Sequence, residues 1–324
     1  MRGGKGARVE ADVTAIEVTC AGSAVFDILA KTSGEHLPIG VLGLVDTFST
    51  AEGGPALRTG RVLAGMGVET RLIIPVGDDI FGQSFRRTVP APHLHVEWVA
   101  SDLPTSTSMV LVDRAGERTM LHTIGADAAI TAEIIESRLT GSILHVGGAL
   151  VLPGLDDPGG APLAGLFERA QARGLFTSMD VVHDSTERWD RVVPALRHTD
   201  LFIPSLIEMT RITGEADPAA GAARLRELGV TFAIVTDGPR GAWVDHDDFS
   251  GHIPAFEVAT VDTTGAGDAF TGGVLTGLTH GLGAEAAARL GAALGALATT
   301  TIGTFSGPAD PAEAWRLAGL EMPA

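Results

Sequence analysis

The sequence predicts an α/β fold built on a mostly parallel sheet. Short apolar runs typical of strands, at residues 143–146, 175–180 and 201–203, alternate with amphipathic segments typical of helices, at residues 162–173 and 188–198. Such alternation indicates parallel strands joined by right-handed helical crossovers. The length of 324 residues fits two domains, or one large α/β domain with an insertion.

Charge and composition narrow the class of partner. The formal net charge of −17 at pH 7 predicts a surface field that repels nucleic acid and anionic membranes, so we expect neither as a partner. The same field repels a nucleotide triphosphate, and a nucleotide site would need local help from amides, Arg or Mg²⁺. Cys20 is the single cysteine, which excludes an intrachain disulfide. No apolar run approaches the ~20 residues that a membrane-spanning helix needs.

Residues 1–14 are Gly-rich and charged and have no apolar centre. This pattern is unlike a signal peptide and predicts a flexible leader in front of one α/β domain over residues 15–324. We therefore expect the protein to be cytoplasmic.

Asp27 lies just beyond the carboxyl end of the first predicted strand, residues 15–22. In open parallel sheets ligands bind at that edge. Asp27 could accept hydrogen bonds from the hydroxyl groups of a polyol, or it could cap a local turn.

Residues 28–50 fit neither a clear helix nor a buried strand, and they are too many for a plain loop. Further along, residues 108–112 and 118–122 are separated by a turn at residues 115–116, which predicts a β-hairpin.

Several helix starts carry residues suited to capping. Asp78 and Asp79 precede one helix and Asp127 precedes another, so we expect these side chains to cap them. Ser205, with Glu208 three residues later, has the pattern of a capping box.

Two pairs of glycines mark close turns. Gly53 and Gly54 precede a helix that contains Arg58, and Gly238 and Gly241 follow a predicted strand. Glycine lets the backbone approach a ligand closely, although the second pair also fits an ordinary hairpin turn.

The stretch 261–270, VDTTGAGDAF, predicts the end of a strand, a Gly-rich turn and the start of a helix over about residues 268–282. Gly265 and Gly267 remove the Cβ atoms that would keep an anion from the backbone, and the free N–H groups of the first helical turn attract one. Asp268 in that turn would repel a phosphate. Its place makes sense if it takes a proton from a nucleophile while the amides hold the phosphoryl group under attack. A plain strand–helix connection is the alternative.

Residues 262–270, DTTGAGDAF, match without substitution the second signature of the ribokinase-like (PfkB-type) carbohydrate kinases. Residues 53–67, GGPALRTGRVLAGMG, are similar to the family's first signature. The resemblance implies a three-layer α/β/α fold with a mostly parallel central sheet and a small β lid near residues 28–52 and 105–123. It also implies ATP-dependent phosphorylation of an alcohol group on a sugar or sugar-like molecule, with Mg²⁺.

The resemblance implies a role for each matching residue. Asp268 is the expected general base, and the amides of Gly265, Ala266 and Gly267 are the expected anion hole. Glu208 is expected to hold Mg²⁺ through water. The remaining expected contacts are Asp27, Gly53, Gly54 and Arg58 for the acceptor, and Thr236, Gly238, Gly241 and Thr264 for the nucleotide. The resemblance also allows a K⁺ ion beside residues 262–264 and a homodimer that pairs the open edges of the lid strands.

Four positions hold another residue where the family usually has Asn: Arg58, Asp127, Ser205 and Ala292. Asn offers one donor and one acceptor, whereas Arg58 offers only donors and a fixed charge. Either Arg58 recognises an anionic or differently shaped acceptor, which we favour, or it turns to solvent.

Two other functions stay open. The same pattern fits a nucleoside kinase, and the four replacements fit a non-catalytic regulatory protein that binds a sugar or nucleotide on the same fold. The intact Asp268 and its anion-binding turn argue against the second. The chain has no GxxxxGK[ST] motif, which excludes a P-loop enzyme.

Overall fold

The computed structural model describes residues 17–323 except for residues 32–39, 41, 113–117, 183–184, 302 and 304. The predicted leader at residues 1–14 and the predicted turn at residues 115–116 lie outside the described residues.

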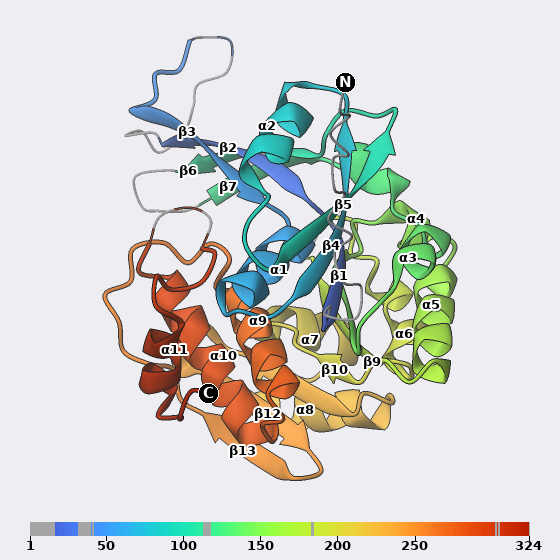
Figure 1. Ribbon diagram of the computed structural model, residues 1–324, viewed down its shortest axis with the longest axis vertical. Coiled ribbons are helices and arrows are strands. Elements are labelled where there is room, and N and C mark those ends of the chain that lie inside the picture. The colour runs from blue at the N-terminus through green and yellow to red at the C-terminus, as the bar shows by residue number, and fades with distance from the viewer. Residues whose placement is uncertain are drawn as a thin grey trace, which may run out of the picture.

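Within these described residues, nine strands form the main sheet in the order β13-β12-β11-β10-β9-β8-β1-β4-β5 (Figure 1). Every pairing from β11 to β5 is parallel, and β12 and β13 are added antiparallel at one edge. The predicted mostly parallel sheet is therefore confirmed. In chain order the strands are β1 (Val18–Gly22), β4 (Thr70–Gly77), β5 (Leu94–Ser101), β8 (Ile143–Ala149), β9 (Phe176–Val181), β10 (Leu201–Phe202), β11 (Phe232–Thr236), β12 (Ala242–His246) and β13 (Phe249–Ile253).

Helices cover both faces of this sheet and complete three layers (Figure 1). Successive strand residues point to opposite faces, so Leu72 and Ile73 enter different hydrophobic cores. The core containing Leu72 is closed by α1 (Pro55–Gly65), α2 (Ile80–Thr88), α9 (Ala266–Thr279) and α10 (Ala284–Ala298). The core containing Ile73 is closed by α3 (Ala132–Arg138), α4 (Pro153–Asp156), α5 (Ala161–Ala172), α6 (Val193–Leu196), α7 (Leu206–Thr213) and α8 (Pro218–Glu227).

The C-terminal helix α11 (Pro311–Ala318) extends the first of these helical layers. Its Trp315 is buried in a third apolar cluster together with residues of α1, α9 and α10. Short 3-10 helices complete the described secondary structure at Gly125–Ala129, Trp189–Arg191 and Gly238–Arg240.

A second, smaller sheet stands above the main sheet in the view of Figure 1. Among the described residues it has four strands in the order β3-β2-β6-β7, where β2 is Val25–Lys31, β3 Thr47–Gly53, β6 Thr107–Val112 and β7 Arg118–Thr123. These strands occupy the segments expected to form the lid, and β6 and β7 pair antiparallel as predicted. We refer to this four-stranded sheet as the lid.

The chain crosses between the lid and the main domain around Asp127, a fully buried residue. The Asp127 carboxylate accepts hydrogen bonds from the hydroxyl of Ser23 at 2.5 Å and from the N–H of Ala24 at 3.3 Å. Its own N–H donates to the hydroxyl of Ser106 at 3.0 Å. Burial raises the pKa of Asp127 to about 7. One residue thus ties together the entry points of β2 and β6 and the segment that leaves β7.

The prediction that Asp127 caps a helix is wrong. Helix α3 begins at Ala132 and its cap is Thr131, whose hydroxyl accepts the N–H of Ile134 at 3.3 Å. The prediction for Asp79 is confirmed, because its carboxylate accepts the N–H groups of Phe81 and Gly82 at the start of α2.

We predict that Asp127→Ala lowers the free energy of unfolding by about 2–4 kcal/mol, because it leaves a hydroxyl and an N–H buried without their acceptor. Urea unfolding followed by circular dichroism measures this change. Asp102→Ala, at an exposed position, is the control and should stay within about 0.5 kcal/mol of the unsubstituted protein. Equal stability of the two variants would contradict the role given to Asp127.

Candidate active site

The turn before α9 is held in shape by Asp262. Its Oδ1 atom accepts the N–H of Thr264 at 3.0 Å and the hydroxyl of Thr264 at 2.7 Å, and Oδ2 accepts the N–H of Gly303 at 3.3 Å. Gly265 follows with φ of 75°, a left-handed conformation that favours glycine, and α9 begins at the next residue. The local sequence therefore forms the Gly-rich turn and helix start that the pattern predicts. The predicted end of a strand at this point is wrong, because β13 ends at Ile253 and residues 254–265 form no strand.

Space is open beside the first turn of α9. A Cβ atom added to Gly267 would meet no other atom within 4 Å. Of the three amides expected to form the anion hole, that of Ala266 donates a long hydrogen bond of 3.3 Å to the carbonyl of Thr263. An anion at this helix start would lie beside the open side of Gly267. It would compete with the Thr263 carbonyl for the N–H of Ala266, whose present hydrogen bond is weak.

Asp268 lies in the same turn and contacts α1. The hydroxyl of Thr59 donates to the main-chain carbonyl of Asp268 at 3.3 Å, and the Asp268 side chain is 15% exposed. Its Oδ2 atom lies 3.7 Å from Nη1 of Arg58. Packing of α1 on α9 thus places a mostly buried carboxylate beside a guanidinium and beside the open first turn.

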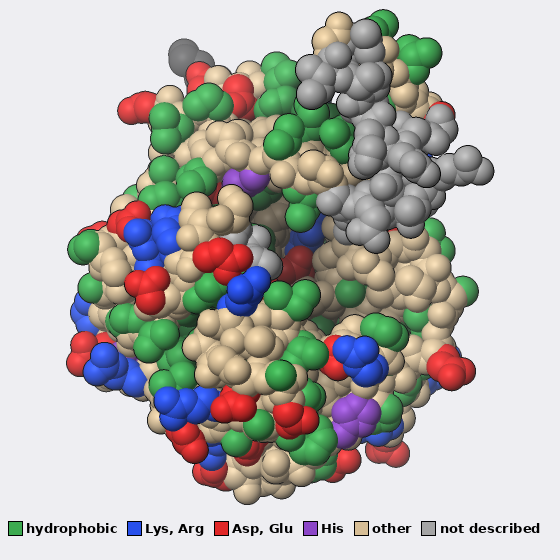
Figure 2. Space-filling model, turned by 180° about the vertical axis from the view of Figure 1, so that it is seen from behind, with side chains coloured by type: hydrophobic (Ala, Val, Ile, Leu, Met, Phe, Trp, Pro, Cys, Tyr) green, Lys and Arg blue, Asp and Glu red, His purple; other side chains and the backbone are tan. Residues whose placement is uncertain are grey.

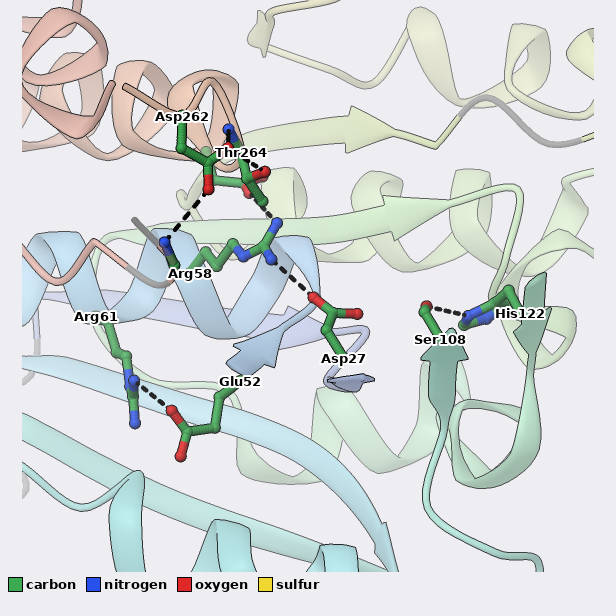
Figure 3. Close-up of polar contacts among 10 residues, drawn as sticks. Asp27, Glu52, Arg58, Arg61, Ser108, His122, Asp262 and Thr264 are labelled. Atoms are coloured by element: carbon green, nitrogen blue, oxygen red, sulfur yellow. Dashed lines mark hydrogen bonds and ion pairs between the residues drawn. The ribbon is translucent and has the colours of Figure 1, made fainter. Parts of the chain in front are cut away.

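Arg58 also contacts the lid. Its Nη2 atom donates to Oδ2 of Asp27, on β2, at 2.9 Å, and both side chains are 14% exposed (Figure 3). The alternative that Arg58 turns to solvent is therefore wrong. A Cβ atom on Gly53 would lie 2.3 Å from Oδ2 of Asp27 and 3.0 Å from Nη2 of Arg58, so this ion pair requires glycine at position 53.

Gly54 is constrained by the main chain. It has φ of 93°, and a Cβ atom there would lie 2.5 Å from the carbonyl oxygen of Ser23. The absence of a Cβ at Gly54 therefore lets the start of α1 pack closely against the backbone that follows β1, at the edge of the lid.

Two further lid residues lie on the same face of the sheet as Asp27. The strand register pairs Asp27 with Ser108 and Ser108 with His122. The Ser108 hydroxyl and Nδ1 of His122 are 3.0 Å apart (Figure 3). Burial raises the pKa of Asp27, although the charge of Arg58 and a hydrogen bond from Ser108 act in the opposite direction. This polar row could not be predicted from the sequence, because only the strand register reveals it.

A second carboxylate, Asp180, was also missed. It lies at the end of β9 and accepts the N–H of Gly148 at 2.6 Å. Burial, together with the charges of Asp268 and Glu208, raises the pKa of Asp180 well above its usual range. The criterion that identified Asp27 would also have identified Asp180, because both follow or end a predicted strand at the carboxyl edge of the sheet, where ligands bind.

The pKa of Asp268 reflects this crowding. Burial raises it to about 6, and the charges of Glu208 and Asp27 act in the same direction, while Arg58 opposes them. A carboxyl group with a pKa near 6 is a stronger base than an ordinary aspartate and is still mostly ionised at pH 7.

Glu208 forms the capping box that its spacing predicts. Its Oε2 atom accepts the N–H of Ser205 at 2.7 Å and the hydroxyl of Ser205 at 2.8 Å. No group of three or more His, Cys, Asp or Glu side chains suited to a metal ion occurs within the described part of the chain. Mg²⁺ usually keeps several waters and takes only one or two carboxylates, and the mutual repulsion of Asp180, Glu208 and Asp268 suits such a cation.

The glycines expected to line a nucleotide lie in the turn between β11 and β12. The strands pair antiparallel, as expected for a hairpin, and Thr236 at the end of β11 donates its N–H to the carbonyl of Pro204 at 3.0 Å. Gly238 has φ of 53° with no atom within 4 Å of an added Cβ, whereas a Cβ on Gly241 would lie 2.1 Å from the carbonyl of Ile253. Gly238 is thus open to a ligand, and Gly241 is required by close packing.

Figure 2, from the opposite side, shows the surface hollowed below the lid, with basic and acidic side chains visible in the hollow. Asp27, Gly53, Arg58, Gly265 and Asp268 are brought together by the contacts described above. Thr236 lies next to Ser205 through a β-bridge, and so adjoins the helix of Glu208.

One family of known proteins matches nearly the whole chain. The model of the pfkB family carbohydrate kinases matches residues 15–310. The chain belongs to this family. The kinase is 30% identical over 302 residues to a fructokinase from Klebsiella pneumoniae, a match that covers 88% of this chain and 94% of that protein. The predicted class, a phosphotransferase acting on a sugar, is confirmed.

Solved structures share the kinase's fold. A ribokinase from Thermotoga maritima has a TM-score of 0.78 and 22% identity, covering 94% of this chain and 99% of that one. The Arabidopsis thaliana ribokinase complexed with ribose and ATP has a TM-score of 0.77 and 20% identity, covering 95% and 100%. These likenesses confirm the predicted ribokinase-like fold. Among the helices that the structure describes, none combines the length and the apolar character needed to cross a bilayer.

Proposed function

We propose that the protein transfers the γ-phosphoryl group of ATP to an alcohol group of a sugar or sugar-like molecule, with Asp268 as the general base. One observation carries this proposal. The Asp268 carboxylate is mostly buried in the first turn of α9, with a pKa raised to about 6, beside the open N-terminus of that helix. A base and an anion site therefore adjoin each other, as phosphoryl transfer to an alcohol requires.

The step follows from these positions. Asp268 takes the proton of the acceptor hydroxyl as its oxygen forms a bond to the γ-phosphorus, and the bond from that phosphorus to the bridging oxygen breaks. ADP leaves with the electron pair, and the proton on Asp268 passes to water. The amides of Gly265, Ala266 and Gly267 stabilise the negative charge on the transferring group.

The acceptor lies, in this proposal, between the lid and the start of α9. Asp27 accepts hydrogen bonds from its hydroxyl groups, the backbone at Gly53 and Gly54 approaches it closely, and Arg58 borders it. Ser108 and His122, in register with Asp27, face the same space. Fructose is the first acceptor to test, because the relative from Klebsiella pneumoniae is named a fructokinase.

The nucleotide lies, in this proposal, along Thr236, Gly238, Gly241 and Thr264. Mg²⁺, held through water by Glu208, would neutralise charge on the phosphates of ATP. We extend the proposal to a K⁺ ion beside residues 262–264, which the resemblance to the family allows. A cytoplasmic location stays a prediction.

We also propose that two copies of the chain associate through the lid. The strand register places Phe48, Met109 and Leu121 on the face opposite Asp27, and they are 69%, 42% and 60% exposed. An apolar sheet face of this kind is a liability in a monomer and suits burial against a second copy.

We predict that Asp268→Asn lowers turnover by at least roughly 10²-fold, because Asn cannot accept the proton. Acceptor-dependent ADP release, measured over a panel of sugars, sugar acids and nucleosides, tests this and identifies the acceptor. A near-unchanged rate would remove Asp268 from the role of base. Turnover of nucleosides alone would favour a nucleoside kinase, and no turnover with any acceptor would favour a non-catalytic binding protein.

We predict that kcat/KM for the acceptor falls as the pH drops through about 6, because protonated Asp268 no longer takes a proton. Below that pH the loss should approach about tenfold per unit, and above pH 7 this group should impose no further change. Steady-state rates measured from pH 5 to 8 give this acidic side of the pH–rate profile. A flat profile over that range would contradict the assignment.

We predict that Phe48→Glu converts a dimer to a monomer, because a charge on the apolar face opposes its burial. Light scattering coupled to gel filtration should give twice the chain mass of 33.4 kDa for the unsubstituted protein and one chain mass for the variant. Val193→Glu, on the exposed surface of α6, is the control and should stay dimeric. A monomeric unsubstituted protein would refute the proposal.

A further inference from the structure

Arg58 is the cation around which the carboxylates of the site are arranged. It pairs with Asp27 from the lid and Asp268 from α9, and the charge of Glu208 also acts on Asp268. Asp180 is coupled to the same set through Asp268. Two carboxylates, Asp27 on β2 and Asp268 on α9, thus flank the guanidinium of Arg58 on α1. The charges of two more, Asp180 on β9 and Glu208 on α7, are coupled to Asp268.

The guanidinium spans its two partners with different nitrogen atoms. Nη2 makes a hydrogen bond of 2.9 Å to Asp27, whereas Nη1 lies 3.7 Å from Asp268 and attracts it without a full hydrogen bond. The contact to Asp27 therefore anchors the side chain, and the looser contact leaves the Asp268 carboxylate able to receive a proton from another group. The planar fork of Arg permits this geometry, and the single ammonium of Lys does not.

The surrounding backbone leaves room for this arrangement. A Cβ atom on Gly265 would lie 3.2 Å from Cδ of Arg58, and one on Gly53 would lie 3.0 Å from Nη2. Within the described structure, Nε of Arg58 is buried and has no hydrogen-bond partner.

We propose that Arg58 is a positioning residue, an inference that rests on the proposed function. Arg58 is anchored on the acceptor-binding residue Asp27 and holds the Asp268 carboxylate toward the acceptor hydroxyl. Loss of the guanidinium leaves the Asp268 carboxylate beside Glu208 and Asp180 without the side chain that holds it in place. The carboxylate then turns away from the acceptor hydroxyl, and turnover falls. The effect of Arg58 on acceptor affinity passes instead through Asp27.

Arg61 provides a matched control on the same helix. It lies one turn after Arg58 on α1 and also pairs with the lid, through Glu52 at 3.2 Å, but its partners do not include Asp268. Figure 3 shows the two arginines side by side on α1, with Arg58 directed to Asp27 and Arg61 to Glu52.

The test compares kcat and acceptor KM for the full-length protein and for Arg58→Gln, Arg58→Lys, Arg58→Ala and Arg61→Gln. We expect Arg58→Gln to lower kcat by about 30-fold or more, and Arg61→Gln to change it by less than about threefold. Non-denaturing guanidinium salt should restore activity to Arg58→Ala at least about fivefold, and should restore none to Asp268→Asn. Arg58→Lys should keep less than half of the wild-type kcat.

A second comparison separates the two contacts. In an Asp27→Asn background, Arg58→Gln should raise the acceptor KM no further but should still lower kcat, because the contact to Asp268 is independent of Asp27. Should Arg58→Ala fail to fold, Arg58→Gln and this double variant carry the test.

Distinct outcomes separate the two proposals. If the wild-type chain turns over a sugar and Asp268→Asn does not, yet Arg58→Gln keeps its kcat within threefold, the positioning role falls and the proposed function stands. A kcat lost in Arg58→Ala with no response to guanidinium also overturns the positioning role. If Asp268→Asn is as active as wild type, the proposed function falls and takes this inference with it.

Discussion

The pairing of Arg58 with Asp27 and Asp268 joins three elements that are far apart in the sequence. It connects strand β2 of the lid, helix α1 and helix α9, and each partner is at most 15% exposed. Ion pairs of this kind offset the cost of burying charge only when their geometry is maintained. Glycine at positions 53 and 265 maintains it by leaving space for the guanidinium and its stem. One side chain therefore links the lid directly to the reactive turn.

Much of the fold could be predicted because its signals are local. Strands buried on both faces give continuous apolar runs, as in β11. The start of a helix such as α7 is indicated by the capping box of Ser205 and Glu208. Asp127 shows where this logic stops. A lone Asp before a helix has the pattern of a cap, but its carboxylate binds Ser23, which is 104 residues away in the sequence. A preference for local partners cannot anticipate a bond across that separation.

The candidate site likewise has a part that could be predicted from the local sequence and a part that could not. The turn around Gly265 and Asp268 is encoded within ten residues, and its conformation could be predicted from them. The environment of Asp268 could not, since it depends on Arg58, Asp180 and Glu208 from other elements. The row of Ser108 and His122 depends on the register between β2, β6 and β7, and a slip of one residue would have turned both side chains away from Asp27.

The bonds that Asp127 makes to Ser23, Ala24 and Ser106 limit how the lid can be exchanged between related proteins. Because Ser23, Ala24 and Ser106 all bond to one residue of the main domain, Asp127, a lid transplanted from a relative would inherit only part of its attachment. Chimeras that carry residues 23–24, 106 and 127 from one parent should accept a foreign lid, and chimeras that split this set should express poorly. If related proteins have exchanged lids by recombination, the crossover points should lie outside these residues. Residues 23–24, 106 and 127 would then all come from one parent.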